Sequence, residues 1–150
     1  MHISQKCQYA LRALLELAKR PRTEPTSVGT IASAQAIPAR FLESILGQLR
    51  QGGFVVSRRG AKGGFALVPD PSALSVGAII RFIDGPVSPV RCIAGGGGNG
   101  ECGFYGRCAF LSMWSRARDA IANVYDTTTF SDLMEAEQAA AGKHRSNYCI

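Results

Sequence analysis

The stretch "IPARFLESILGQLRQGGFVVSRRGAKGGFALVPDP" (residues 37–71) decides the fold of this chain. Its first half predicts a helix, because Pro38 suits the first turn of a helix and Gly52 suits a C-terminal cap. Apolar residues recur between them at helical spacing and predict a buried side, made of Phe41, Leu42, Ile45, Leu46 and Leu49. The other side is mainly polar and carries, near its N-terminal end, Arg40, Glu43 and Ser44.

The second half of the stretch predicts a β-hairpin. Two strand-like runs, residues 54–57 and 65–68, flank a turn that is rich in glycine and in basic residues. The basic residues of this turn are Arg58, Arg59 and Lys62. A shorter predicted helix, capped by Ser27 and extending to Ala34, precedes the stretch. Two short helices followed by a basic hairpin indicate a winged helix-turn-helix.

The remaining chain is predicted to be helical, apart from one loop. Helical spacing and caps predict helices within residues 4–20, 76–84 and 110–125, and a last helix starting after Thr129. The fold class is therefore mainly α with a small β-hairpin. The predicted parts are a winged helix-turn-helix domain (1–85), a cysteine-rich cluster-binding loop (86–109), a dimerisation helix with a C-terminal helix (110–141) and a flexible tail (142–150).

The predicted helix over residues 110–125 is apolar over a broader stripe than a small winged-helix domain can cover. The surplus predicts a second subunit, and a two-fold symmetric homodimer suits a palindromic operator. The alternative is a helix that packs only on its own domain.

Charge narrows the classes of partner. The net charge is +6, and residues 1–62 hold ten Lys/Arg against three Asp/Glu, a balance of +7. Such asymmetry favours a polyanion, most often nucleic acid, although a solvated basic surface is the alternative. No apolar run approaches the roughly 20 residues of a membrane span, and the N-terminus lacks a signal-peptide pattern. We expect a cytoplasmic protein with reduced thiols and no membrane partner.

The predicted reading helix carries three side chains suited to double-stranded DNA. Arg40 can hold guanine, Glu43 can accept from cytosine, and Ser44 can contact a base or a phosphate. The alternative is an amphipathic helix with a solvated outer side.

The predicted hairpin adds basic contacts. Arg59 suits a narrow minor groove, and Arg58 and Lys62 suit phosphates. A plain surface hairpin is the alternative.

Cys92, Cys102 and Cys108 are separated by nine and five residues in a glycine-rich segment. These gaps disfavour structural zinc, which usually takes cysteine pairs two to four residues apart. Three thiolates in a reducing compartment suit an iron–sulfur cluster, and the flanking Arg91 and Arg107 favour thiolate over thiol. The alternatives are three unligated thiols or a disulfide between Cys102 and Cys108.

Several segments together resemble the IscR/NsrR-type family of bacterial winged-helix regulators, the Rrf-two family. They are "ISQKCQYALRALLELA", the stretch quoted first, "LSVGAIIRFIDGP", the three spaced cysteines and "TFSDLM". The resemblance implies a homodimer whose long helices cross, with each cysteine loop near the partner's DNA-binding domain. It implies a [2Fe–2S] or [4Fe–4S] cluster on the three cysteines, which senses iron supply, redox state or nitric oxide and thereby changes operator affinity. It also assigns base reading to Arg40, Glu43 and Ser44, and the wing arginine to Arg59.

The resemblance leaves the fourth cluster ligand open. Leu111 stands where some members of the family have a histidine, and Gln8 stands where others have an acidic residue. The first gap between cysteines is also longer than usual in cluster-binding members. The remaining candidates are Gln8, Cys7, Glu101, His2, a bound water or a small thiol.

We therefore expect a homodimeric DNA-binding transcriptional regulator controlled by an iron–sulfur cluster. We expect no enzymatic activity, because the sequence shows no Ser/His/Asp constellation and no C-x-x-C motif. The first alternative is the same regulator switched by thiol oxidation or by bound zinc. A small iron–sulfur redox carrier is the second, and the basic N-terminal part speaks against it.

Overall fold

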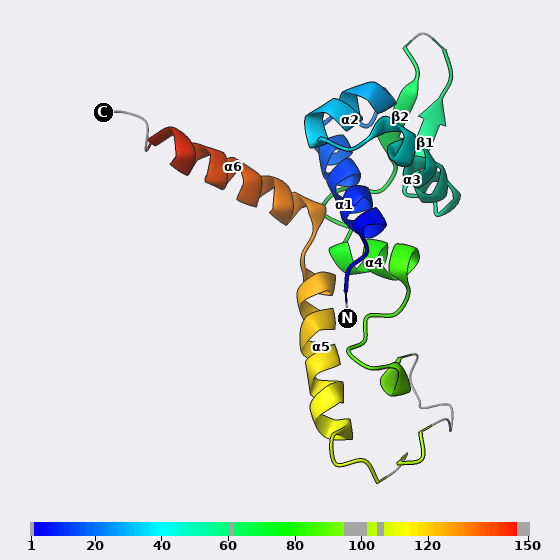
Figure 1. The fold of residues 1–150 in the computed structure, drawn as a ribbon. Coiled ribbons are helices and arrows are strands. Elements are labelled where there is room, and N and C mark those ends of the chain that lie inside the picture. Colours follow the sequence, from blue (N-terminus) through cyan, green and yellow to red (C-terminus); the bar gives the residue numbers. More distant parts are fainter. Residues whose placement is uncertain (1, 61, 95–101, 105–106, 147–150) are drawn as a thin grey trace.

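The fold consists of α-helices and one β-hairpin, which confirms the predicted class (Figure 1). The computed structural model describes residues 2–60, 62–94, 102–104 and 107–146. Within these ranges the elements are α1 (Gln5–Ala18), α2 (Val28–Gln35), α3 (Ala39–Gln51), β1 (Val55–Arg58), β2 (Gly64–Leu67), α4 (Val76–Asp84), the 3-10 helix η1 (Arg91–Ile93), α5 (Leu111–Thr127) and α6 (Phe130–Ser146). No helix in the described ranges is both long and apolar enough to cross a membrane.

Hydroxyl side chains cap the helices where the sequence predicts them. Each of three serine hydroxyls accepts a hydrogen bond from the backbone N–H three residues further on. Ser4 accepts from Cys7 at 3.0 Å, Ser27 from Thr30 at 3.1 Å and Ser75 from Ala78 at 3.2 Å. At α6, the Thr129 N–H donates to Asp132 Oδ2 at 2.8 Å and the Asp132 N–H donates to Thr129 Oγ1 at 3.2 Å. These bonds satisfy N–H groups that the first turn of a helix leaves without a partner.

The predicted helix-turn-helix is formed by α2 and α3. The turn passes through Ala36, whose φ of 48° is left-handed and ends α2. Pro38 is the N-cap residue of α3 rather than part of its first turn, a position where its missing N–H costs no helical bond. Gly52 caps the other end of α3, as predicted.

The wing is an antiparallel hairpin in which Val55 lies opposite Leu67 and Arg58 lies opposite Gly64. The loop between α1 and α2 adds a backbone bridge to this hairpin at Thr26. The Thr26 N–H donates to the Phe65 carbonyl at 2.8 Å, and the Phe65 N–H donates to the Thr26 carbonyl at 2.9 Å. Figure 1 shows the hairpin standing beside α3 and projecting beyond it.

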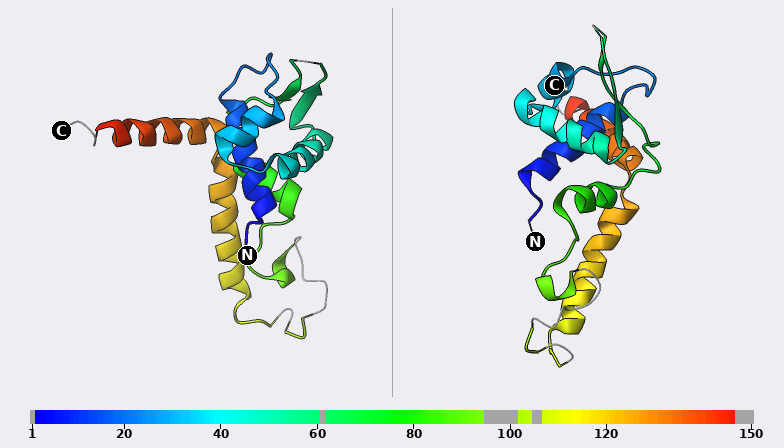
Figure 2. Two further views of the ribbon diagram at one scale, coloured as in Figure 1. Left: turned by 45° about the horizontal axis from the view of Figure 1, so that its top comes forward. Right: turned by 90° about the vertical axis from the view of Figure 1, so that its right-hand side faces the viewer.

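One apolar core joins α1, α2, α3 and the hairpin, and it also buries Phe130 at the start of α6. A smaller cluster of Cys7, Val76, Ile80 and Val87 joins α1 to α4, and the C-terminal half of α5 packs against it. The rest of α5 runs away from the winged-helix domain (Figure 2), and no residue of α5, all of which is described, is buried. The last helix extends to Ser146, so five residues of the predicted tail are helical.

Candidate DNA-binding surface and cysteine site

The three predicted reading residues share the outer side of α3. Arg40, Glu43 and Ser44 are exposed, whereas Leu42 and Leu46 on the opposite side are fully buried. Among the described residues, no hydrogen bond or ion pair engages these three side chains. A guanidinium, a carboxylate and a hydroxyl thus stand at the start of α3, and these groups can read base edges in a major groove.

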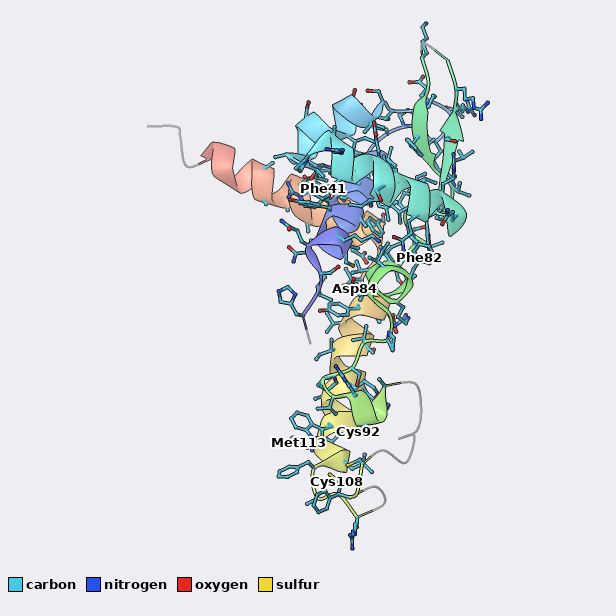
Figure 3. The ribbon with its side chains drawn as sticks, turned by 45° about the vertical axis from the view of Figure 1, so that its right-hand side comes forward. Phe41, Phe82, Asp84, Cys92, Cys108 and Met113 are labelled. Carbon is cyan, nitrogen blue, oxygen red and sulfur yellow. The ribbon has the colours of Figure 1, made fainter. Side chains whose placement is uncertain are left out.

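Phe41 is not in the core, although its spacing predicts a place there. Its side chain is 64% exposed (Figure 3), because it lies at the edge of the apolar stripe rather than at its centre. It forms one wall of a groove of about 300 Å³ between α3 and the start of α1. The groove is lined by Gln5, Lys6, Tyr9, Phe41, Ser44 and Ile45.

The three basic residues of the hairpin differ in their surroundings. Arg59 and Lys62 are exposed and make no hydrogen bond or ion pair with any described residue. Arg58, by contrast, donates from Nη1 to the Thr23 carbonyl in the α1–α2 loop at 2.8 Å. The turn of the hairpin is closed by a hydrogen bond from the Gly63 N–H to the Gly60 carbonyl at 2.8 Å.

Most of the positive charge of residues 1–62 is engaged inside the chain. Lys19 and Arg20 pair with Glu16, Arg22 pairs with Asp70, and Arg12, Arg50 and Arg58 donate to Gln35, Ser57 and Thr23. Four of the ten cations make no such contact within the described residues: Lys6, Arg40, Arg59 and Lys62. Charge counting alone could not separate these two groups, since Arg12, Arg22 and Arg58 meet partners that are distant in sequence.

Glu16 shows how this internal pairing works. Its side chain is buried, and it accepts hydrogen bonds from Arg20 at 2.7 Å and from Gln35 at 3.0 Å. Burial by itself raises the pKa of Glu16. The two hydrogen bonds, together with the charges of Lys19 and Arg20, outweigh burial and hold the pKa below its ordinary value.

Two of the three cysteines lie near the end of α5 that points away from the winged-helix domain. Cys92 is on η1 and Cys108 precedes α5 (Figure 3). Together with Cys102, both thiols are free and partly exposed. Within the described part of a single chain, no three Cys, His, Asp or Glu side chains are close enough to share one metal ion. The three thiols are therefore present, but the described residues do not form one metal site from them.

The candidates for a fourth ligand have different environments. Cys7 is fully buried, and burial, followed by the nearby charge of Asp84, raises its pKa to about 12. Gln8 is exposed and donates from Nε2 to the Ile3 carbonyl at 3.1 Å. His2 is also exposed. Glu101 lies outside the described residues.

The C-terminal end of α5 is firmly attached to α4. Arg81 donates to the Asp126 carboxylate from both terminal guanidinium nitrogens, Nη1 and Nη2, and the Val76 N–H donates to the Thr128 carbonyl at 2.9 Å. Gly77 permits this approach, because a Cβ there would meet the Asp126 carboxylate. Near the middle of α5, Arg118 donates to the Ile93 carbonyl at 3.4 Å. One helix thus contacts both the cysteine segment and the winged-helix domain.

Comparison with known proteins assigns a relationship to nearly the whole chain. Residues 3–136 match the Rrf2 family, described as iron-dependent transcriptional regulators. The HTH-type transcriptional regulator CymR of Bacillus subtilis is 38% identical over 133 residues, 89% of either chain. The HTH-type transcriptional regulator IscR of Yersinia pseudotuberculosis is 30% identical over 147 residues, which are 98% of this chain and 87% of that one.

Solved structures agree with this relationship. The structure of B. subtilis CymR, named as the global cysteine regulator, matches with a TM-score of 0.76 at 37% identity and covers 91% of this chain and 98% of that one. The oxidized form of Staphylococcus aureus CymR matches with a TM-score of 0.68 at 33% identity, over 90% of this chain and 97% of that one. These relatives are transcriptional regulators, which confirms the prediction of a non-enzymatic function.

Proposed function

This chain belongs to the Rrf2 family of DNA-binding transcriptional regulators, and on that premise we propose that an iron–sulfur cluster controls its affinity for DNA. The protein acts as a homodimer on a palindromic operator. Cys92, Cys102 and Cys108 hold a [2Fe–2S] or [4Fe–4S] cluster that senses iron supply, redox state or nitric oxide. The observation that carries the proposal is the presence of three free, partly exposed thiols around η1 and the start of α5, outside the DNA-binding domain.

The donor chemistry fits such a cluster, because thiolates are its usual protein ligands. Within the described residues the three thiols do not form one metal site, so cluster binding requires them to come together, with a fourth ligand from this chain or from its partner. Gln8, His2 and Glu101 remain candidates for this ligand, and the burial of Cys7 disfavours its thiol. When bound, the cluster supplies a centre that oxidants and nitric oxide can attack.

DNA binding follows from the exposed side chains of α3 and the wing. Arg40, Glu43 and Ser44 read base edges in the major groove, and Arg59 enters the minor groove beside it. Lys62 contacts a phosphate and adds affinity without sequence preference. Arg58 differs from these residues, because its guanidinium already donates to the Thr23 carbonyl within the chain.

Dimerisation uses the side of α5 that its own domain leaves uncovered. Ile121 and Tyr125 pack on the winged-helix domain. Met113 is 47% exposed and Val124 is 59% exposed, and both follow a helical spacing that also includes Ala117 and Ala120. Two alanines between larger apolar residues let a second α5 approach closely.

The signal reaches the DNA-binding surface through α5 and α4. A rearrangement around Cys92 acts on α5 through Arg118, and α5 acts on α4 through the Arg81–Asp126 pair. The next residue along α4, Phe82, packs edge-on against Phe54 at a centroid distance of 5.1 Å, directly after α3. A shift of α4 therefore changes the position of the reading helix relative to the wing.

A second candidate is the same regulator switched by thiol oxidation or by zinc. Its support is the likeness to S. aureus CymR, whose structure is of an oxidized form. Partly exposed thiols also suit oxidation. An external two-electron oxidant, such as a peroxide, converts two thiols into a disulfide or one thiol into a sulfenic acid, and is itself reduced.

Anaerobic purification distinguishes the two candidates. A brown protein that contains iron and sulfide, and loses both in a Cys92→Ala variant, supports the cluster. A colourless protein whose DNA binding changes with a reversible disulfide, or with zinc, contradicts the cluster and supports the second candidate.

DNA binding is tested independently with Arg59→Ala. In gel-shift titrations at fixed salt, we expect the variant to lose about 1–3 kcal/mol of affinity for a selected operator duplex, as for one specific base contact. Unchanged affinity would show that the wing assignment is wrong.

A further inference from the structure

The wing and the α1–α2 loop are joined along a seam. We define the seam by three contacts between the loop and the hairpin segment: Thr26 with Phe65, Arg58 with the Thr23 carbonyl, and Arg22 with the Val68 carbonyl. The first contact is a pair of backbone hydrogen bonds, and the other two are side-chain donations at 2.8 and 3.2 Å. Through the seam, the loop pairs with β2 on the side away from β1.

Gly64 makes this approach possible. It lies opposite Arg58 in the hairpin, and its φ is 157°. A Cβ at this position would run into the backbone of Thr26. The loop therefore lies directly against β2, and the Thr23 carbonyl comes within reach of a side chain on β1.

Arg58 has a role in the seam that its place in a basic turn does not suggest. A backbone carbonyl is a fixed acceptor, and at 2.8 Å its bond to a guanidinium is charge-assisted. Arg58 is also the last residue of β1, and Arg59 follows it directly. The same strand is linked to α3 by Arg50, which donates to Ser57 Oγ at 3.2 Å.

We propose that Arg58 is a positioning residue: it holds the turn end of β1 on the α1–α2 loop and thereby sets Arg59, the next residue, relative to α3. It does not contact a phosphate. The inference rests on the proposed wing contact with DNA and changes the role of one of its residues.

Salt dependence separates the two roles. Each phosphate contact lowers the slope of log affinity against log salt by about 0.9, whereas a positioning residue changes affinity without changing that slope. The test uses the full-length dimer, purified anaerobically, and a duplex selected against the wild-type protein. The variants are Arg58→Met, which keeps the aliphatic stem, Arg58→Lys, which keeps charge and one donor, and Lys62→Met as the matched loss of one charge.

We expect Arg58→Met to weaken binding about fivefold, the effect of one lost hydrogen bond, with an unchanged salt slope. Arg58→Lys recovers part of the affinity. Lys62→Met makes the slope shallower. Hydrogen exchange at the amides of Thr26 and Phe65 becomes faster in Arg58→Met and stays unchanged in Lys62→Met, which reports the seam without DNA.

A shallower slope in Arg58→Met, with unchanged amide exchange, identifies a phosphate contact and overturns the proposal. Unchanged affinity in Arg58→Met also overturns it when Arg59→Ala and Lys62→Met are impaired. If those two tip variants bind normally, the wing contact of the proposed function is wrong. Amide exchange then decides alone: faster exchange at Thr26 and Phe65 supports Arg58 as the residue that holds the hairpin, and unchanged exchange overturns it.

Discussion

Replacing Gly64 by alanine should separate the wing from the α1–α2 loop. The new Cβ would clash with the carbonyl oxygen and carbon of Thr26 and with the backbone nitrogen of Ser27. Backbone atoms cannot rotate away as a side chain can, so the Thr26–Phe65 bridge must open. Loss of its two hydrogen bonds costs about 1 kcal/mol each, and the φ of 157° adds about 1 kcal/mol of strain for a residue with a side chain. The expected fall in the free energy of unfolding is roughly 3 kcal/mol.

Two other glycines serve as matched controls. Gly53 has a φ of 76°, but a Cβ there meets nothing within 4 Å, so Gly53→Ala should cost only the strain, about 1–2 kcal/mol. Gly47 lies inside α3 with ordinary helical backbone and open space around it, so Gly47→Ala should stabilise the protein by up to about 1 kcal/mol.

The assay is urea unfolding followed by circular dichroism, at one protein concentration, because the stability of the proposed dimer depends on concentration. The expected order, from most to least stable, is Gly47→Ala, wild type, Gly53→Ala, Gly64→Ala. A Gly64→Ala protein no less stable than Gly53→Ala would contradict the clash with Thr26, since it would mean that the loop does not lie against β2.

Three further predictions concern buried charge, a buried thiol and the subunit interface. The folded state holds the pKa of Glu16 below its ordinary value of 4.5. The stability that ionised Glu16 contributes is therefore present above pH 4.5 and is lost as the pH falls toward the folded pKa. Urea titrations from about pH 6 to 3 should show this loss in the wild type and a smaller loss in Glu16→Gln. Burial raises the pKa of Cys7 to about 12. Iodoacetamide near neutral pH should therefore modify the partly exposed thiols of the metal-free protein and leave Cys7 unmodified, as measured by peptide mass spectrometry. Rapid modification of Cys7 in the folded protein would contradict its burial. Ala120→Glu should convert the dimer into a monomer in light scattering, since it places a charge on the uncovered side of α5, whereas Asn123→Glu on the neighbouring exposed side should remain dimeric.

The winged-helix fold could be predicted because its signals are local. These signals act within one or two helical turns, so they can be recognised without knowledge of distant contacts. They are the serine caps, the missing N–H of Pro38, the cap at Gly52 and the spacing of apolar residues. Phe41 shows the limit of this reading. Periodicity places it with the core, but its position at the edge of the stripe leaves it exposed.

The candidate sites were predictable as residue types but not as geometry. The exposure of the residues predicted to read bases, on α3, follows from helical spacing, since the polar side of an amphipathic helix faces solvent. Arg58 and Arg59 cannot be separated in this way. They are adjacent, identical and basic, and only the approach of the α1–α2 loop engages one of them.

Local signals define the elements, their order and the chemical groups that the protein carries: a helix-turn-helix, a basic hairpin and three spaced cysteines. The pairs of Lys19 and Arg20 with Glu16 are local too. Only the fold brings Arg12, Arg22 and Arg58 to their distant partners, buries Cys7, and makes α5 the connection between the cysteine segment and α4. The difference is one of range: caps, periodicity and helical ion pairs depend on residues about one turn apart, whereas burial, long-range pairs and the seam depend on segments that meet only after folding.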